Sequence, residues 1–137
     1  MTNMELCNIA IKAMERAYVP YSHYRVGAAL LTASGKVYSG CNIENASFTP
    51  TVCAERTAFF KAISDGETEF SAIAVAGGKD GKIEGVFQPC GVCRQVMAEF
   101  CSPEFKILMV EADGKYSEVT LNDLLPNAFT PKNLKNF

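Results

Sequence analysis

Apolar residues recur at the spacing of an α-helix in three parts of the chain. The first part follows Thr2–Glu5, where a hydroxyl and a carboxylate can satisfy free backbone amides as a capping box. It should end before Val19-Pro20, because proline disfavours helical geometry in the residue that precedes it. The second part begins at Thr51 and ends at Asp65-Gly66. Further helices are expected over Gly91–Cys101 and, as a short segment, over Leu121–Leu125.

Short apolar runs bounded by glycine, proline or polar clusters predict the strands. Val26–Leu31 and Val37–Cys41 flank the turn-forming Ala33–Lys36, which predicts a hairpin. Ala112–Gly114 is the signal for a second hairpin. The other predicted strands are Phe70–Ala76, Phe105–Glu111 and Tyr116–Thr120, and loops are expected over Tyr21–Tyr24, Asn42–Pro50 and Gly77–Lys82.

The order of these elements, α-β-β-α-β-α-β-β, predicts a single α/β domain over residues 1–137. We expect a three-layer α/β/α sandwich around a five-stranded mixed sheet. Right-handed crossovers would place the helices that begin near Thr51 and Gly91 side by side on one face of the sheet. Both helix N-termini would then point to the same end of the sheet.

Composition limits the classes of function. The net charge of −2 and the pI near 5.4 argue against nucleic acid as a partner, since such proteins usually cluster lysine and arginine. No apolar run approaches the roughly 20 residues of a membrane span. Six cysteines without a secretion signal favour metal binding or redox chemistry over disulfides, so a cytoplasmic chain with reduced thiols is expected.

Three of these cysteines form a candidate metal site. Cys53 lies at the start of the second predicted helix, and Cys90 and Cys93 form a Cys-x-x-Cys motif at the start of the third. Helix N-termini favour thiolate over thiol, and three thiolates leave a tetrahedral zinc with one open position, which is typical of catalytic zinc. The sequence therefore predicts one Zn²⁺ per chain.

Charged residues beside the cysteines suggest what the metal would do. Glu55 can lie next to the metal without ligating it, and from there it can move protons as a general acid and base. Three thiolates give the zinc site a net negative charge, which a cation should offset through hydrogen bonds to sulfur. Arg56 and Arg94 both follow a motif residue, and Arg56 is preferred because Arg94 can equally be a surface charge.

The two cysteine motifs, Cys53–Glu55 and Pro89–Gln95, resemble the small homotetrameric cytidine deaminase family that binds zinc through three cysteines. The resemblance includes Tyr21–Ala29, Gly40–Ala46 and Leu124–Phe129, so it covers nearly the whole chain. It implies a cytidine deaminase-like fold and zinc-dependent hydrolysis of cytidine and 2′-deoxycytidine to uridine and 2′-deoxyuridine plus ammonia, a reaction of pyrimidine salvage. It also implies a homotetramer whose active sites are shared between subunits.

The resemblance assigns roles to individual residues. Glu55 would be the proton shuttle, Asn42 and Glu44 would bind the ribose hydroxyls of a nucleoside, and the Ala54 backbone amide would contact the pyrimidine. Tyr24 would line the ring pocket, where the family often has phenylalanine. Three further residues would serve an adjacent subunit, namely Ala46, Phe48 (often tyrosine in the family) and Phe129.

Other readings remain open. A related deaminase could act on an aminopyrimidine antibiotic of the blasticidin type, although Asn42 and Glu44 argue for a sugar, or on a polynucleotide, although the acidic pI argues against one. A non-catalytic, zinc-stabilised interaction domain is the alternative from another class. Outside the motifs, we interpret Cys7, Cys41 and Cys101 as small core residues and His23 as a surface or interface residue.

Overall fold

The computed structural model describes residues 1–134, and the end of the predicted domain, residues 135–137, lies outside the described residues. The capping box at the N-terminus is confirmed, since Thr2 Oγ1 accepts the Glu5 amide at 3.1 Å and Glu5 accepts the Thr2 amide at 2.9 Å. The elements in chain order are α1 (Asn3–Ala13), η1 (Met14–Arg16), β1 (Tyr24–Thr32), β2 (Val37–Cys41), α2 (Ala54–Ser64), β3 (Phe70–Lys79), α3 (Gly91–Phe100), β4 (Lys106–Val110), η2 (Ala112–Gly114), β5 (Tyr116–Thr120), α4 (Leu121–Leu124) and η3 (Pro131–Leu134).

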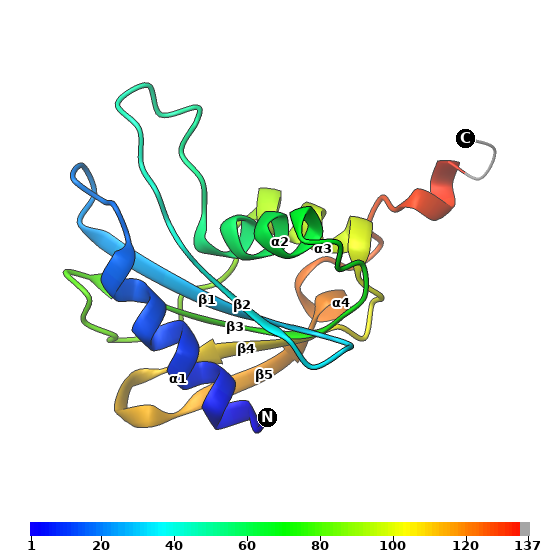
Figure 1. Ribbon diagram of the computed structural model, residues 1–137, viewed down its shortest axis with the longest axis horizontal. Coiled ribbons are helices and arrows are strands. Elements are labelled where there is room, and N and C mark those ends of the chain that lie inside the picture. The colour runs from blue at the N-terminus through cyan, green and yellow to red at the C-terminus, as the bar shows by residue number, and fades with distance from the viewer. Residues whose placement is uncertain (135–137) are drawn as a thin grey trace.

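The predicted three-layer sandwich around a five-stranded mixed sheet is confirmed (Figure 1). The strand order is β2-β1-β3-β4-β5, and only the β3–β4 pair is parallel. Helix α1 covers one face of the sheet, and α2, α3 and α4 cover the other.

Each face of the sheet has its own apolar core. Alternate side chains of a strand point to opposite faces, so Ala28 and Leu30 of β1 pack toward α2 and α3, whereas Ala29 packs toward α1. The strands β1, β3 and β4 are buried on both faces, which explains their nearly continuous apolar sequences. The helices are therefore held at fixed positions over the sheet.

Glycine lets α2 lie very close to the sheet. A side chain on Gly40 of β2 would put its Cβ 2.5 Å from the backbone oxygen of Ala54 and 2.6 Å from the amide nitrogen of Ala58. Such distances are not possible for a real Cβ, so only glycine permits this contact. The first turn of α2, which carries Glu55, is thereby pressed against β2.

The predicted loop over residues 77–82 is wrong in its first half. Strand β3 continues to Lys79, and Gly77 and Gly78 pair with Val26 and Arg25 of β1. The glycines are needed for close approach, because a Cβ on Gly78 would lie 1.7 Å from the Lys82 carbonyl oxygen. Two glycines in a row read as a turn from sequence, whereas here they let the following chain fold back over the strand.

The first predicted helix also differs from the structure. The α-helix ends at Ala13, and a 3₁₀ turn continues the chain to Arg16. The guanidinium of Arg25 donates to the carbonyl oxygens of Met14, Glu15 and Ala17 at the end of this turn. Within residues 1–134, no helix combines the length and the apolar character that a membrane crossing requires.

Candidate active site

The N-termini of α2 and α3 lie at the same end of the sheet, as expected from right-handed crossovers. Strands β2 and β3 both run antiparallel to β1, and β4 runs parallel to β3, so these three strands share one direction. The helices that connect them run back in the opposite direction on the same face. Their N-termini therefore lie at the C-terminal end of these strands, with Cys53 and Cys90 as the N-cap residues of α2 and α3.

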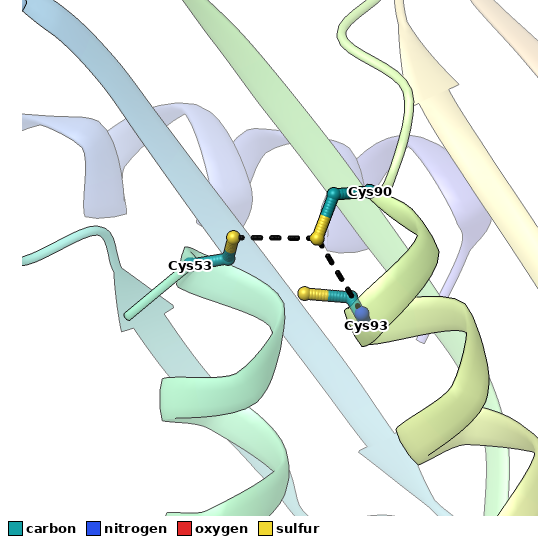
Figure 2. A group of neighbouring side chains, drawn as sticks. All are labelled: Cys53, Cys90 and Cys93. Atoms are coloured by element: carbon teal, nitrogen blue, oxygen red, sulfur yellow. Dashed lines mark hydrogen bonds between the residues drawn. The ribbon is translucent and has the colours of Figure 1, made fainter. Parts of the chain in front are cut away.

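Cys53, Cys90 and Cys93 form one cluster, with all three sulfur atoms within 4.8 Å of one another (Figure 2). The sulfurs of Cys53 and Cys90 are 3.6 Å apart. In a tetrahedral site with Zn–S bonds of about 2.3 Å, neighbouring sulfurs lie about 3.8 Å apart. Cys93 is buried whereas Cys90 is exposed, so one side of the cluster is open to solvent. The three cysteines thus fit one zinc ion with an accessible fourth position.

Hydrogen bonds favour the thiolate form of Cys53 in this cluster. A hydrogen bond from Cys93 lowers the pKa of Cys53, the guanidinium of Arg56 lowers it further, and the same sulfur–sulfur hydrogen bond raises the pKa of Cys93. Arg56 donates to Cys53 Sγ at 3.4 Å. Arg56 is therefore the cation that contacts the sulfurs.

Arg94 has a different role. Its guanidinium donates to the carbonyl oxygens of Pro89 at 2.7 Å and Leu124 at 2.8 Å, and to the side-chain oxygen of Gln88 at 3.2 Å. It thus ties the start of α3 to α4 and to the segment that carries Cys90.

Glu55 is buried beside the cluster. Its side chain is only 3% exposed, and burial, together with the charge of Cys53, raises its carboxyl pKa to about 7. The nearby Arg56 acts in the opposite direction but does not cancel the effect of burial. A carboxyl group that titrates near neutral pH can both accept and donate a proton, as a general acid–base group must.

A cavity of about 170 Å³ lies over Cys53, Ala54, Glu55 and Cys90. The sequence-predicted residues Tyr24 and Asn42 also line it, as do Val26, Phe87 and Gln88, which the sequence analysis did not single out. Phe87 lies against Tyr24, with ring centroids 5.9 Å apart. Pockets for drug-sized ligands measure roughly 300–1,000 Å³, so this cavity suits a single small ring.

Asn42 lines the cavity, and both Asn42 and Glu44 are held by hydrogen bonds to the start of β1 or to the residues just before it. Asn42 accepts the Val26 amide at 2.9 Å and donates to the Tyr24 carbonyl at 2.8 Å. Glu44 accepts the amides of Tyr21 and Ser22 at 3.0 and 3.1 Å and the hydroxyl of Ser22. The hydroxyl of Ser22, followed by the amides, lowers the pKa of Glu44, so this carboxylate is ionised at neutral pH.

The three residues that the resemblance assigns to a neighbouring subunit do not line the cavity of their own chain. Ala46 and Phe48 lie on the loop between β2 and α2, which extends away from the body of the molecule (Figure 1). Phe48 is 73% exposed and forms an edge-to-face pair with Tyr21, with ring centroids 6.3 Å apart. Phe129 is 60% exposed, and its carbonyl accepts a hydrogen bond from Gln95.

The remaining cysteines and the histidine lie outside the cluster. Cys7 is a residue of α1 and is buried in the core between α1 and the sheet. Cys41 and Cys101 are half-buried, and His23 is exposed. All six cysteines are free thiols. The interpretation of Cys7 as a core residue and of His23 as a surface residue agrees with these positions.

Comparison with known proteins identifies the family of this chain. Residues 1–109 match the family model of the cytidine and deoxycytidylate deaminase zinc-binding region. The chain belongs to this deaminase family. A cytidine deaminase from Sporosarcina psychrophila is 50% identical over 123 residues, covering 90% of this chain and 88% of the relative. A cytidine deaminase from Halalkalibacterium halodurans is 47% identical over 136 residues, covering 99% and 100%.

Solved structures give the same family. The crystal structure of a cytidine deaminase from Burkholderia pseudomallei superposes with a TM-score of 0.86 at 46% identity, covering 94% of this chain and all of the other. The family's zinc-binding region includes the helices α2 and α3 of this chain. The cysteine cluster lies within this region and fits one zinc ion per chain.

Proposed function

We propose that this deaminase hydrolyses cytidine and 2′-deoxycytidine to uridine and 2′-deoxyuridine and releases ammonia. The observation that carries the proposal is the buried Glu55 beside three clustered sulfurs, with Glu55 and two of the cysteines, Cys53 and Cys90, lining one small cavity. Relatives named as cytidine deaminases that align over nearly the full chain support the substrate class. The corresponding role is pyrimidine salvage.

Each residue of the site has a separate role in the proposed reaction. A zinc ion held by Cys53, Cys90 and Cys93 would lower the pKa of water and so supply a nucleophile at neutral pH. The carboxylate of Glu55 takes a proton from the attacking water, whose oxygen bonds to the amino-bearing ring carbon, and delivers that proton to the exocyclic amino nitrogen, which leaves as ammonia when its bond to that carbon breaks. Arg56 offsets the negative charge of the thiolates. Burial in the cavity keeps bulk water away from the Glu55 carboxyl.

The nucleoside would be held from two sides. The ring enters the cavity beside Tyr24, and the Ala54 backbone amide donates to it. Asn42 and Glu44 hydrogen-bond the sugar hydroxyls, which a free nucleoside presents and an aminopyrimidine antibiotic does not. The small size of the cavity also disfavours a polynucleotide.

We also infer a homotetramer in which neighbouring subunits complete each site. Phe60, Val92 and Phe100 are 48%, 57% and 37% exposed and line one hollow on the outer side of α2 and α3. Large exposed apolar patches are typical of protein contacts. In such an assembly, Ala46, Phe48 and Phe129 would reach the cavity of a neighbouring subunit. Light scattering of the purified protein would measure the mass of the assembly and so test the tetramer.

We also propose a cytoplasmic location, because thiolate ligands need reducing conditions.

The decisive experiment follows the ultraviolet spectrum of cytidine with purified protein, together with a count of zinc per chain. We expect loss of the cytidine absorbance and one zinc per chain. Zinc-loaded protein that leaves cytidine unchanged would refute the proposal and favour a non-catalytic zinc domain. Deamination of an aminopyrimidine antibiotic or of single-stranded DNA, without deamination of free nucleosides, would favour the other deaminases.

The sugar contact has a separate test. Glu44→Gln should raise KM for cytidine about tenfold or more, because it removes a charged hydrogen-bond acceptor, while kcat changes little. An unchanged kcat/KM would remove Glu44 from the binding site but would leave the reaction itself in place.

A further inference from the structure

The hydroxyl of Ser22 has hydrogen bonds on both sides. Its oxygen accepts the backbone amide of Tyr24 at 3.0 Å. The hydroxyl itself donates to Oε2 of Glu44. Because a serine hydroxyl has one proton to donate, the bond from the Tyr24 amide leaves that proton directed at the carboxylate.

Ser22 and its neighbours together fix the plane of the Glu44 carboxylate. Oε1 accepts two backbone amides, those of Tyr21 at 3.0 Å and Ser22 at 3.1 Å, which use both of its lone pairs. Oε2 accepts only the Ser22 hydroxyl among the described residues, so it has capacity for one further donor. The two amides alone anchor Oε1, and the hydroxyl adds the contact that sets where Oε2 points.

The same segment connects Glu44 to the cavity. Ile43 bridges Tyr18 on one side and Val52 on the other in extended geometry, so Asn42 and Glu44 point to the same side of the chain. Asn42 lines the cavity and donates to the carbonyl of Tyr24. The Tyr24 peptide is thus held through its amide by Ser22 and through its carbonyl by Asn42.

We propose that Ser22 is a positioning residue for the sugar: its hydroxyl holds Glu44 so that the free lone pair of Oε2 meets a ribose hydroxyl. This role rests on the proposed binding of the sugar by Glu44. Ser22 does not itself touch the substrate. Tyr24 keeps the hydrogen bond that its carbonyl accepts from Asn42, so the loss of Ser22 should weaken mainly the part of substrate recognition that depends on the sugar hydroxyls.

The test compares cytidine with 2′,3′-dideoxycytidine, which lacks the hydroxyls that Glu44 would bind. Ser22→Ala should lower kcat/KM for cytidine about tenfold, mainly through KM, and should change kcat/KM for the dideoxynucleoside less than about twofold. Ser22→Thr retains the hydroxyl, and because Ser22 is exposed the extra methyl has room, so this variant should restore most of the loss.

Ser34→Ala is the matched control. Ser34 is also exposed and donates to a glutamate, Glu67, at 3.1 Å, but it lies in the turn after the far end of β1. At about 3.3 Å per residue, the length of β1 separates it from Tyr24 by more than about 25 Å. Both kcat/KM values of this variant should match those of the wild type.

The outcomes separate the two proposals. Equal losses on both substrates for Ser22→Ala, or no loss on cytidine, would overturn the positioning role. If the wild type fails to deaminate cytidine, the proposed function fails. If Glu44→Gln weakens cytidine binding but Ser22→Ala does not, the proposed function stands and only the role of Ser22 is wrong.

Discussion

Replacing Glu55 with glutamine should stabilise the zinc-free protein while it removes the activity of the zinc-loaded one. Burial raises the carboxyl pKa of Glu55 from 4.5 to about 7, and the side chain is 3% exposed. A pKa difference of about 2.5 corresponds to about 3 kcal/mol, since each unit is equivalent to about 1.4 kcal/mol. This is the free energy by which the ionised carboxylate destabilises the fold.

The effect depends on pH in a defined direction. Below about pH 4.5 the carboxyl is protonated in both the folded and the unfolded chain, so ionisation makes no difference to stability. Between about pH 4.5 and 7 the unfolded chain releases the proton first, and the free energy of unfolding therefore falls as the pH rises. Above about pH 7 the free energy of unfolding has lost the full amount, about 3 kcal/mol. Glutamine does not ionise, so the variant avoids this loss.

The assay is urea unfolding of chelator-treated protein at about pH 5 and pH 8. Glu55→Gln should exceed the wild type by less than about 1 kcal/mol at the lower pH and by about 3 kcal/mol at the higher. Glu104→Gln, at an exposed position between α3 and β4, is the control and should show no such difference. A variant with the same advantage at both pH values, or one less stable than the wild type at pH 8, would refute the reasoning.

With zinc bound, Glu55→Gln should lose about 10²–10⁴-fold in kcat at unchanged zinc content, because general acid–base catalysis contributes about that factor. A variant that keeps its activity would exclude Glu55 as the proton shuttle. A variant that loses its zinc would instead indicate that Glu55 helps to hold the metal.

Three further predictions concern the metal and the packing of α2. Arg56→Ala should weaken zinc binding about 10- to 100-fold, because it removes the donor 3.4 Å from Cys53 Sγ; unchanged affinity in competition with a zinc-binding dye would contradict this. Cys93→Ala should lose the zinc that the three-sulfur cluster holds, and metal analysis that still finds one zinc per chain would be evidence against the site. Gly40→Ala should destabilise the fold by about 1–3 kcal/mol, because its Cβ would lie 2.5 Å from the Ala54 oxygen. Gly85→Ala has open space around it and is the control, so equal melting temperatures for the two variants would refute the packing argument.

Local rules predicted most of the elements but not every boundary. The capping box at Thr2 and the strand Tyr116–Thr120 agree with the structure. Gly77 and Gly78 were misread because a turn and a strand that needs close backbone contact both favour glycine. The distinction depends on Lys82 and Phe87, which fold over these glycines from further along the chain.

The sequence by itself predicted which residues would hold the metal, because three cysteines at two helix starts are a typical ligand set for Zn²⁺. It also indicated Arg56 as the cation at the sulfurs, which the structure places 3.4 Å from Cys53 Sγ. Only the tertiary structure decided that Phe87 and Gln88 line the cavity, that Arg94 donates to the last carbonyl of α4, and that the Ser22 hydroxyl donates to Glu44. These contacts join segments that are distant in sequence, and their geometry is set by how the helices and loops pack on the sheet.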